Sequence, residues 1–512
     1  MSARTPASSV VVIGGGLAGI TAATALRDAG VDVTLVEARP RLGGAASSFA
    51  RGDLMIDNGQ HVFLRCCTSY QDLLARLGAT GLVTIQERFD VTVLSPRGTA
   101  RLRRTALPGP LHMCRALAGY RLLPLADRLK VARAALAMRF VNPADPKLDG
   151  TALGDWLAAR GQSEAARRLM WDLFIVSALN IAGDEASLPL SATVIKTALL
   201  GARDAADVGI ANVPLGDLHG RATAELLGRL GAQVRLGSRA VAIDRLPSGF
   251  VVGLESAAGG TRLAGGNGSQ PAAADVSALA ADGVVLALPA AQTARLAGDA
   301  GVAGASRWDE LGSSPIVNIH VVYDRPVTTL PFAAAVESPV QWVFDKTRQS
   351  GLATGQYLAV SLSAADSYVD VPAASLREQF LPALEQLFPA AAQARVSDYF
   401  VTRERRATFR QVPGIGAIRP GAATSVPGLV LAGAWTDTGW PDTMEGAVRS
   451  GQNAAERMIS ELARQPVATQ PVTARTVLAG SRASDEPPRG RSLLAGARAS
   501  DEPPRGRSGA AS

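Results

Sequence analysis

Three glycines and one acidic residue near the N-terminus have the spacing of a dinucleotide-binding motif. Gly14-x-Gly16-x-x-Gly19 follows the apolar run 10–13 and opens a helical segment, and Glu37 ends the next β-branched run. The first glycine permits a tight turn, the second lets backbone approach a pyrophosphate, and the third lets helix and strand pack closely. The helix N-terminus offers N–H groups to the phosphates, and a carboxylate at the offset of Glu37 bonds ribose hydroxyls. The ordered pattern predicts a bound dinucleotide rather than a glycine-rich surface turn.

A second strand-to-helix turn lies near the C-terminus. An apolar strand ends at Gly433, a loop follows, and a helix is predicted from about Thr443 to Leu462. Such a turn can present N–H groups to a phosphate or a helix dipole to an electron-rich ring. We therefore expect both ends of the chain to contribute to one ligand site.

The elements that position these motifs alternate between short strands and helices. Residues 213–289 and 428–462 both look like returns to the first sheet, and short buried strands alternating with helices favour a parallel sheet. Alternating runs within 315–410 predict a second sheet. The small-residue segment 256–283 is interpreted as a flexible insertion between two strands.

Residues 80–210 are mostly helical in pattern. Within them, apolar residues recur at helical spacing over the predicted helix 125–140, namely Leu125, Leu129, Ala132, Leu136 and Phe140. The predicted fold is α/β, with a Rossmann-like domain interleaved with an α+β substrate domain. We predict the first domain to comprise residues 1–80, 211–300 and 415–463, and the second to comprise 81–210 and 301–414.

The bulk composition is that of a globular protein. Its residues are 47% hydrophobic and 19% charged, no apolar stretch reaches the ~20 residues of a membrane span, and no signal peptide precedes the first strand. Three cysteines suggest neither a disulfide framework nor a metal site. We therefore predict a cytoplasmic protein without metal. Residues 464–512 contain a duplication with a 16-residue period, and their composition favours a disordered tail.

The net charge of +7 is unevenly distributed. Residues 97–139 carry ten Arg or Lys and one acid, Asp127, whereas no nucleic-acid motif is present. Nucleic acid is therefore not an expected partner. The basic block is either a solvated helical face or a surface that docks peripherally on an anionic membrane, at the inner face of the cell membrane.

The extended N-terminal motif, through Gly43-Gly44, together with the C-terminal turn resembles the flavin-containing amine oxidase and phytoene desaturase superfamily over roughly residues 10–460. The resemblance implies an amine oxidase-like two-domain flavoprotein with FAD as cofactor. It also implies that Val241 supplies backbone bonds to adenine. The FAD-binding residues that it implies are Gly14, Gly16, Leu17, Ala18, Gly19, Glu37, Ala38, Arg39, Gly43, Gly44, Val241, Gly433, Met444, Glu445 and Gly446.

Three segments are similar to a narrower branch of that superfamily, the hydroxysqualene dehydroxylases of hopanoid biosynthesis. They are 57–64, 171–180 and 435–441. The resemblance implies removal of a hydroxyl from a long isoprenoid lipid, with reduced FAD as electron source. Two positions depart from relatives: Ala434 replaces an acid after the glycine of the C-terminal turn, where Asp437 or Asp442 could compensate, and Ala45 replaces an arginine.

Four residues are candidates for the chemistry. A leaving hydroxyl needs a proton donor, and His61 can titrate near neutrality, although a histidine that bonds a backbone carbonyl is an equal alternative. Asp57 is a second candidate, with a turn-forming role as the alternative. Trp435 and Trp440 could wall the substrate site or simply pack in the core.

Other functions on the same scaffold remain open. A carotenoid desaturase would run the flavin in the opposite direction. An amine oxidase would need a lysine near the flavin, and Lys130, Lys147, Lys196 and Lys346 give no clear candidate. A flavin-free lipid carrier is disfavoured by the intact glycine motif.

Overall fold

A five-stranded parallel sheet joins three distant stretches of the chain. The computed structural model describes residues 8–256 and 276–464. The parallel sheet has the order β10-β2-β1-β14-β20, and every neighbouring pair is parallel. Its strands are β1 (Ser9–Ile13), β2 (Asp32–Glu37), β10 (Gln233–Leu236), β14 (Gly283–Leu286) and β20 (Leu429–Leu431). The predicted return of later segments to the first sheet is confirmed, while the residue boundaries of the two domains stay a prediction.

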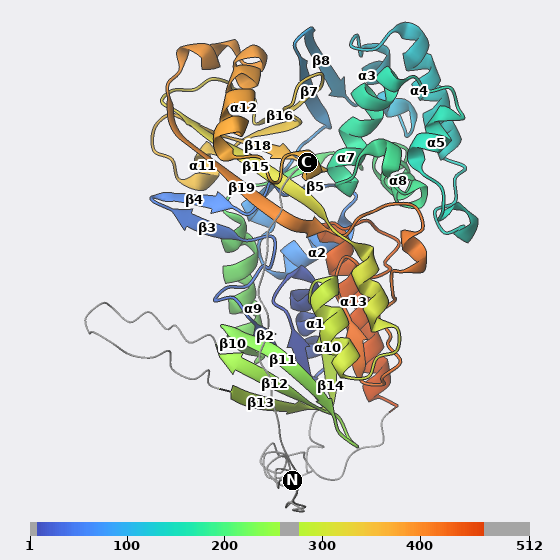
Figure 1. Cartoon of the computed structure of the whole chain (residues 1–512), viewed down its shortest axis with the longest axis vertical. Coiled ribbons are helices and arrows are strands. Elements are labelled where there is room, and N and C mark those ends of the chain that lie inside the picture. The colour runs from blue at the N-terminus through green and yellow to red at the C-terminus, as the bar shows by residue number, and fades with distance from the viewer. Residues whose placement is uncertain (1–7, 257–275, 465–512) are drawn as a thin grey trace, which may run out of the picture. The chain divides into compact units, whose positions relative to one another are not determined.

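Helices α1 (Leu17–Asp28) and α13 (Met444–Leu462) lie side by side against this sheet (Figure 1). A Cβ atom added to Gly451 would overlap the carbonyl oxygen of Ala18. Glycine at position 451 therefore lets the two helix backbones touch. Helices α2 (Thr68–Arg76), α9 (Ala222–Arg229) and α10 (Ala290–Asp299) complete the helices around the sheet.

A seven-stranded mixed sheet forms the second layer of the fold, in the order β19-β15-β18-β17-β16-β7-β8. Its strands are β7 (Asp90–Ser95), β8 (Gly98–Arg103), β15 (Ser314–Tyr323), β16 (Phe332–Ala335), β17 (Trp342–Asp345), β18 (Gln356–Leu362) and β19 (Val396–Thr408). The second sheet predicted within 315–410 is confirmed. Helix α12 (Ala373–Leu387) covers one face of this mixed sheet through a buried apolar cluster.

Helices cover the opposite face of the mixed sheet. They are α3 (Cys114–Ala118), α4 (Leu125–Met138), α5 (Leu153–Ala158), α6 (Glu164–Ala166), α7 (Asp172–Leu179) and α8 (Leu188–Val194), with a π-helical turn at Arg167–Trp171. The prediction that 80–210 is mostly helical is wrong for residues 90–103, which form the hairpin β7–β8. Val91 and Val93 alternate toward the core there, and Gly98 adopts the positive φ of the turn.

Smaller sheets connect these layers. They are β3 (Ser48–Arg51) with β4 (Leu54–Asp57), then β5 (Val62–Leu64), β9 (Val208–Ala211) and β6 (Val83–Ile85), and finally β11 (Ser238–Arg245), β12 (Phe250–Ser256) and β13 (Val276–Ala281). Residues 276–281, predicted as flexible insertion, instead form β13, because their backbone groups pair with β12. The rest of that insertion (257–275) and the duplicated tail lie outside the described residues.

Helix α4 confirms the predicted helix, but its predicted apolar stripe faces solvent. Leu129 is 64% exposed and Phe140, just past the helix, is 84% exposed, whereas Val131, Ala134 and Met138 face the core. Helical spacing identifies an apolar face, but cannot tell which of two such faces the rest of the chain covers. No helix in residues 8–256 and 276–464 is long and apolar enough to cross a bilayer.

Candidate functional site

The glycines of the first turn are needed for different structural reasons. A Cβ on Gly14 would overlap the carbonyl oxygen of Ala287, and one on Gly19 would overlap the carbonyl oxygen of Gly14. A Cβ on Gly16 would meet only the Cα of Gly44, at 3.8 Å. Internal packing therefore requires the outer two glycines, whereas the middle one keeps backbone open to an approaching group. Gly16 caps α1 without a side-chain bond, which leaves the first-turn N–H groups, from Leu17 and Ala18 onward, available to phosphate.

Glu37 is held at the edge of this turn. Its Oε2 accepts a hydrogen bond from Gly15 N at 2.7 Å, and its Oε1 accepts one from Arg39 N at 2.8 Å. Gly43 N donates to Gly15 O at 2.8 Å, and a Cβ on Gly44 would lie 2.8 Å from the Cα of Gly16. The two glycine segments thus pack directly on each other and leave a carboxylate beside an open backbone, which fits the ribose and pyrophosphate of a dinucleotide.

Val241 lies at an irregularity in the ladder between β11 and β12. The pairing jumps from Ala240 to Ala242, so Val241 has no direct partner across the strands. Such a bulge frees one residue's backbone groups from the sheet. Arg295 donates to the carbonyl of Val241 at 3.4 Å. The backbone role toward adenine fits this position and stays a prediction, as do the roles of Ala38 and Arg39, which are exposed after β2.

The second turn begins at Gly433, whose N–H donates to Ser450 Oγ at 2.8 Å. Thr443 caps α13 by accepting from Gly446 N, and Met444 opens the helix. Glu445 is buried. Its carboxylate accepts from Ser69 N (3.2 Å), Tyr70 N (2.8 Å) and Arg449 Nε (2.7 Å). These bonds hold the N-terminus of α2 and occupy the carboxylate of Glu445. The predicted contact with the cofactor would therefore come from the backbone of Glu445, and it stays a prediction.

Arg419 organises the loop after Gly433, and no sequence signal indicated this role. Its buried guanidinium donates to the carbonyl oxygens of Ala434 (3.1 Å), Trp435 (3.1 Å) and Trp440 (2.8 Å), as well as that of Thr436. Burial lowers the pKa of Arg419. A single cation therefore fixes the loop that carries the departure at Ala434.

The two aspartates that could replace the missing acid at 434 are bonded elsewhere. Asp437 Oδ1 accepts from Gly439 N at 3.1 Å within its own turn. Asp442 Oδ2 accepts from Phe409 N at 2.9 Å, and burial raises the pKa of Asp442 to about 6. These bonds favour local structural roles for both carboxylates over replacement of the acid that Ala434 lacks.

The two tryptophans of this loop differ in environment. Trp435 is buried, donates from Nε1 to Leu288 O at 2.9 Å and packs against Trp308. This environment favours core packing over the predicted role as a substrate wall. Trp440 is half-buried beneath the guanidinium of Arg449 and stays a candidate wall.

Asp57 is buried and lies at the centre of a group of polar contacts. Its Oδ1 accepts from Ser48 Oγ (2.7 Å) and from Leu215 N (2.9 Å), and its Oδ2 pairs with Lys346 Nζ at 2.8 Å. Both carboxylate oxygens already have buried polar partners, so these contacts favour a structural role over proton donation. They also identify Lys346 as a lysine inside the site, which the sequence alone did not indicate.

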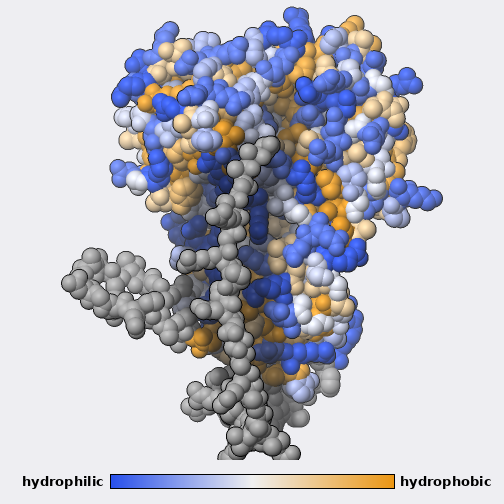
Figure 2. Space-filling model, viewed as in Figure 1, coloured by the Kyte–Doolittle hydropathy of each residue, from blue (hydrophilic) through white to orange (hydrophobic). Residues whose placement is uncertain are grey.

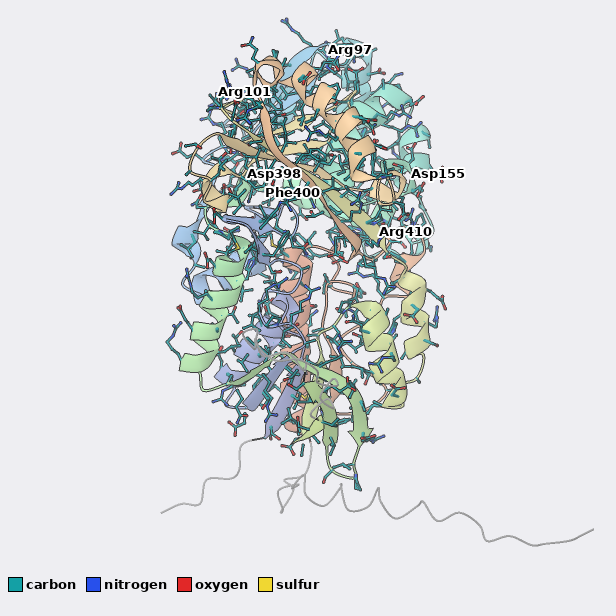
Figure 3. The ribbon with its side chains drawn as sticks, turned by 60° about the vertical axis from the view of Figure 1, so that its left-hand side comes forward. Arg97, Arg101, Asp155, Asp398, Phe400 and Arg410 are labelled. Atoms are coloured by element: carbon teal, nitrogen blue, oxygen red, sulfur yellow. The ribbon has the colours of Figure 1, made fainter. Side chains whose placement is uncertain are left out.

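The hairpin that carries Asp57 is fastened to the mixed sheet. Arg51 pairs with Asp398 at 3.2 Å and lies over the ring of Phe400, and Phe400 stacks on His320. Figure 3 labels Asp398 and Phe400. This anchoring positions the turn between β4 and β5, which contains His61, over the mixed sheet.

His61 is half-buried in that turn. Its Nδ1 lies 3.4 Å from the carbonyl oxygen of Gly59, and no hydrogen bond to its Nε2 comes from any described residue. Burial lowers the pKa of His61, Asp57 and the bond to Gly59 O oppose this shift, and Lys346 adds to it. An imidazole with a free ring nitrogen beside an ion pair can exchange a proton with a ligand.

A cavity of about 590 Å³ lies between α7 and the hairpin β16–β17. Leu169, Leu173, Val176, Val340 and Trp342 are among its lining residues. This volume is within the ~300–1,000 Å³ typical of ligand pockets. The apolar lining residues suit a hydrocarbon, and four charged residues, Glu164, Arg168, Asp172 and Glu337, line the same cavity.

The chain matches the model of the flavin-containing amine oxidoreductases over residues 17–459. It belongs to that family. The predicted superfamily and the two-domain flavoprotein fold are thereby confirmed. A solved member of this amine oxidoreductase fold, cyclohexylamine oxidase from Brevibacterium oxydans, covers 90% of this chain and 100% of its own, with a TM-score of 0.63 and 22% identity.

Among curated relatives of this chain, hydroxysqualene dehydroxylase from Sinorhizobium fredii is 30% identical over 88% of this chain and 99% of its own. Zeta-carotene desaturase from Synechocystis is 24% identical over 89% and 98%. The protein is therefore an FAD-dependent oxidoreductase, as predicted. The open backbone at Gly16 and the carboxylate of Glu37 fit FAD, which supplies hydride chemistry when bound.

Proposed function

We propose that the protein reductively removes the hydroxyl group of hydroxysqualene to give squalene, in hopanoid biosynthesis. In this reaction the carbon–oxygen bond breaks and a carbon–hydrogen bond forms. When bound, reduced FAD would supply the hydride, and one proton would join the leaving hydroxyl to form water. The atoms and electrons therefore balance with one reduced flavin for each alcohol.

The observation that supports this choice is the full-length similarity to hydroxysqualene dehydroxylases. A relative of that name aligns over 99% of its own length at 30% identity, against 24% identity for zeta-carotene desaturase from Synechocystis. The segments 57–64, 171–180 and 435–441 of this chain resemble that branch.

In this reaction we assign separate roles to His61, to the Asp57–Lys346 pair and to the cavity along α7. His61 is the proposed source of the proton that the leaving oxygen needs. Because Nδ1 faces the carbonyl of Gly59, Nε2 carries that proton only when the ring is a charged imidazolium. Asp57 and Lys346 keep the turn in place through their buried ion pair. The apolar residues that line the cavity along α7 contact part of the isoprenoid chain.

A carotenoid desaturase is the second candidate, because zeta-carotene desaturases are also similar over most of the chain. An amine oxidase is less well supported, since the buried lysine, Lys346, is paired with Asp57. The deciding experiment is anaerobic incubation of the reduced holoenzyme with hydroxysqualene, followed by product analysis. We expect squalene and oxidised flavin in equal amounts. No squalene, together with turnover of a carotene or an amine by the oxidised enzyme, would reject the proposal.

We also propose that the enzyme collects its lipid at the inner face of the cell membrane, as a peripheral cytoplasmic protein. Exposed large apolar side chains gather in and near α4, namely Leu107, Leu111, Leu125, Leu129, Leu136 and Phe140. Lys130 and Arg133 are exposed on the same helix. Figure 2 shows apolar surface interspersed with hydrophilic residues where α4 and α5 lie. Apolar residues beside basic ones suit an anionic bilayer surface.

A further inference from the structure

Asn318 is a buried asparagine without an internal partner. Its side chain lies on β15, the residue is 2% exposed, and its Oδ1 has no hydrogen-bond partner among the described residues. Leaving a buried polar group unpaired disfavours folding by about 1–3 kcal/mol. A leucine of similar shape would avoid that penalty, so a partner from outside the chain is the simplest reason for an amide here.

A neighbour on the same strand shows what a satisfied polar residue looks like. His320 lies two residues further along β15, on the same face of the sheet. Its Nδ1 bonds Tyr357 Oη at 2.7 Å, and its Nε2 bonds Thr402 Oγ1 at 2.9 Å. The fold therefore supplies partners to one polar side chain on this face and supplies none to Oδ1 of Asn318.

Asn318 lies next to His61 across a glycine. A Cβ placed on Gly59 would be 3.4 Å from Cε1 of His61 and 3.9 Å from Nδ2 of Asn318. Gly59 also has a φ of 89°, which side chains rarely adopt. The missing side chain leaves the space beside Gly59 open between the imidazole ring of His61 and the amide of Asn318.

The same residue lies within reach of the apolar cavity. Asn318 pairs with Ser361 on β18, and Ser361 pairs with Trp342 on β17, so the three form one row across the sheet. Neighbouring strands are about 4.8 Å apart, which places Trp342 about 10 Å from Asn318. Trp342 lines the cavity. One wall of the cavity and the amide therefore lie on the same face of the sheet.

We propose that Asn318 binds the hydroxyl group of the isoprenoid alcohol, with His61 as the second contact to that group. This inference rests on the proposed function and assigns the residue that recognises the leaving group. The amide N–H donates to the hydroxyl oxygen, and the amide oxygen can accept its proton. Squalene has no oxygen, so the same contact separates substrate from product.

The test measures binding of two ligands to the oxidised holoenzyme. Hydroxysqualene and squalene are titrated separately in detergent micelles, and the flavin absorbance is followed. We expect the native protein to bind hydroxysqualene at least tenfold more tightly, since a hydrogen bond to a buried amide contributes about 1.5 kcal/mol. Asn318→Leu should lose this preference, retain its squalene affinity and unfold at the same or a higher temperature. Asn453→Leu, exposed on α13, is the matched control and should keep the preference.

Two results would overturn the inference. In the first, Asn318→Leu still binds hydroxysqualene more tightly than squalene, and the native enzyme makes squalene. This result rejects the role of Asn318 and leaves the proposed function intact. In the second, Asn318→Leu keeps the same preference, but the absorbance spectrum of its flavin differs from that of the native protein. This result assigns the amide to the flavin. A native enzyme that makes no squalene would instead reject the proposed function. Asn318→Ala, which adds no bulk, serves the same test if leucine prevents folding.

Discussion

Among single residues, His219 links the glycine segments to the helices. Its Nδ1 bonds Ala46 O at 3.0 Å, just after Gly43-Gly44, and its Nε2 bonds Tyr70 Oη at 2.8 Å. Burial lowers the pKa of His219 to about 4. The ring is therefore neutral at pH 7, and it acts as a fixed spacer rather than an acid.

This lowered pKa predicts a pH dependence of stability. Below the ordinary histidine pKa of about 6.5, the unfolded chain gains a proton that the folded chain takes only near pH 4, so acidification favours unfolding. We expect His219 alone to reduce the free energy of unfolding by about 3 kcal/mol between pH 7 and pH 4. In urea titrations at both pH values, His219→Gln should lose less stability on acidification than the native protein. Equal losses in the two proteins would contradict this account.

Among the elements, the crossing of α1 and α13 brings the two nucleotide turns together. The crossing depends on Gly451, because a larger residue there would push α13 away from Ala18. Both helices begin at turns predicted to bind FAD, at Gly16 and Thr443. The distance between the two N-termini is thus set by a contact within the helices and not by the turns themselves.

We therefore predict that Gly451→Ala loses FAD and stability together. Overpacking a close backbone contact costs about 1–3 kcal/mol, and separation of the helix N-termini should raise the dissociation constant for FAD. Calorimetry and the flavin content of the purified protein measure the two effects. Gly228→Ala on α9 is the control, since its Cβ would meet nothing within 4 Å, and it should stabilise by about 0.5–1 kcal/mol. Full FAD content in Gly451→Ala would count against a role for this contact.

At the scale of the whole described chain, the exposed apolar side chains of α4 have no role within the protein itself. Contiguous exposed apolar side chains are uncommon on soluble proteins and mark interaction sites. On this helix they lie beside Lys130 and Arg133, and α4 packs near α6, which contributes Glu164 to the cavity rim. A membrane at α4 would therefore bring lipid close to the cavity.

Binding to vesicles tests this surface. We expect the native protein to sediment with anionic phosphatidylglycerol vesicles at low salt, and the variant Leu129→Glu with Phe140→Glu to bind at least a hundredfold more weakly, because each buried apolar side chain contributes about 1.5–3 kcal/mol. Val276→Glu replaces a side chain that is equally exposed on β13 and should bind normally. The proposal is rejected if the native protein does not sediment at low salt.

Local sequence was enough to predict the nucleotide-binding turn, the helix at 125–140 and the second sheet within 315–410. The nucleotide-binding motif lies within about 25 residues, from Gly14 to Glu37. Its geometry therefore follows from short-range spacing in the sequence. The hairpin at 90–103 was missed although its two strands are neighbours in sequence, and only its place beside β16, more than 200 residues later, depends on the fold.

The sequence by itself determined the cofactor, since an ordered motif over neighbouring residues specifies how backbone meets a dinucleotide. Only the tertiary structure decided which polar groups are left free. Glu445 and Asp57 have the residue types of catalytic acids, yet distant N–H groups and Lys346 occupy their oxygens. Asn318 carries no motif, and its unpaired amide becomes visible only when β15 is buried. Hydrogen-bond satisfaction depends on partners that are far apart in sequence, and for that reason folding, and not spacing, selects the residues that can act.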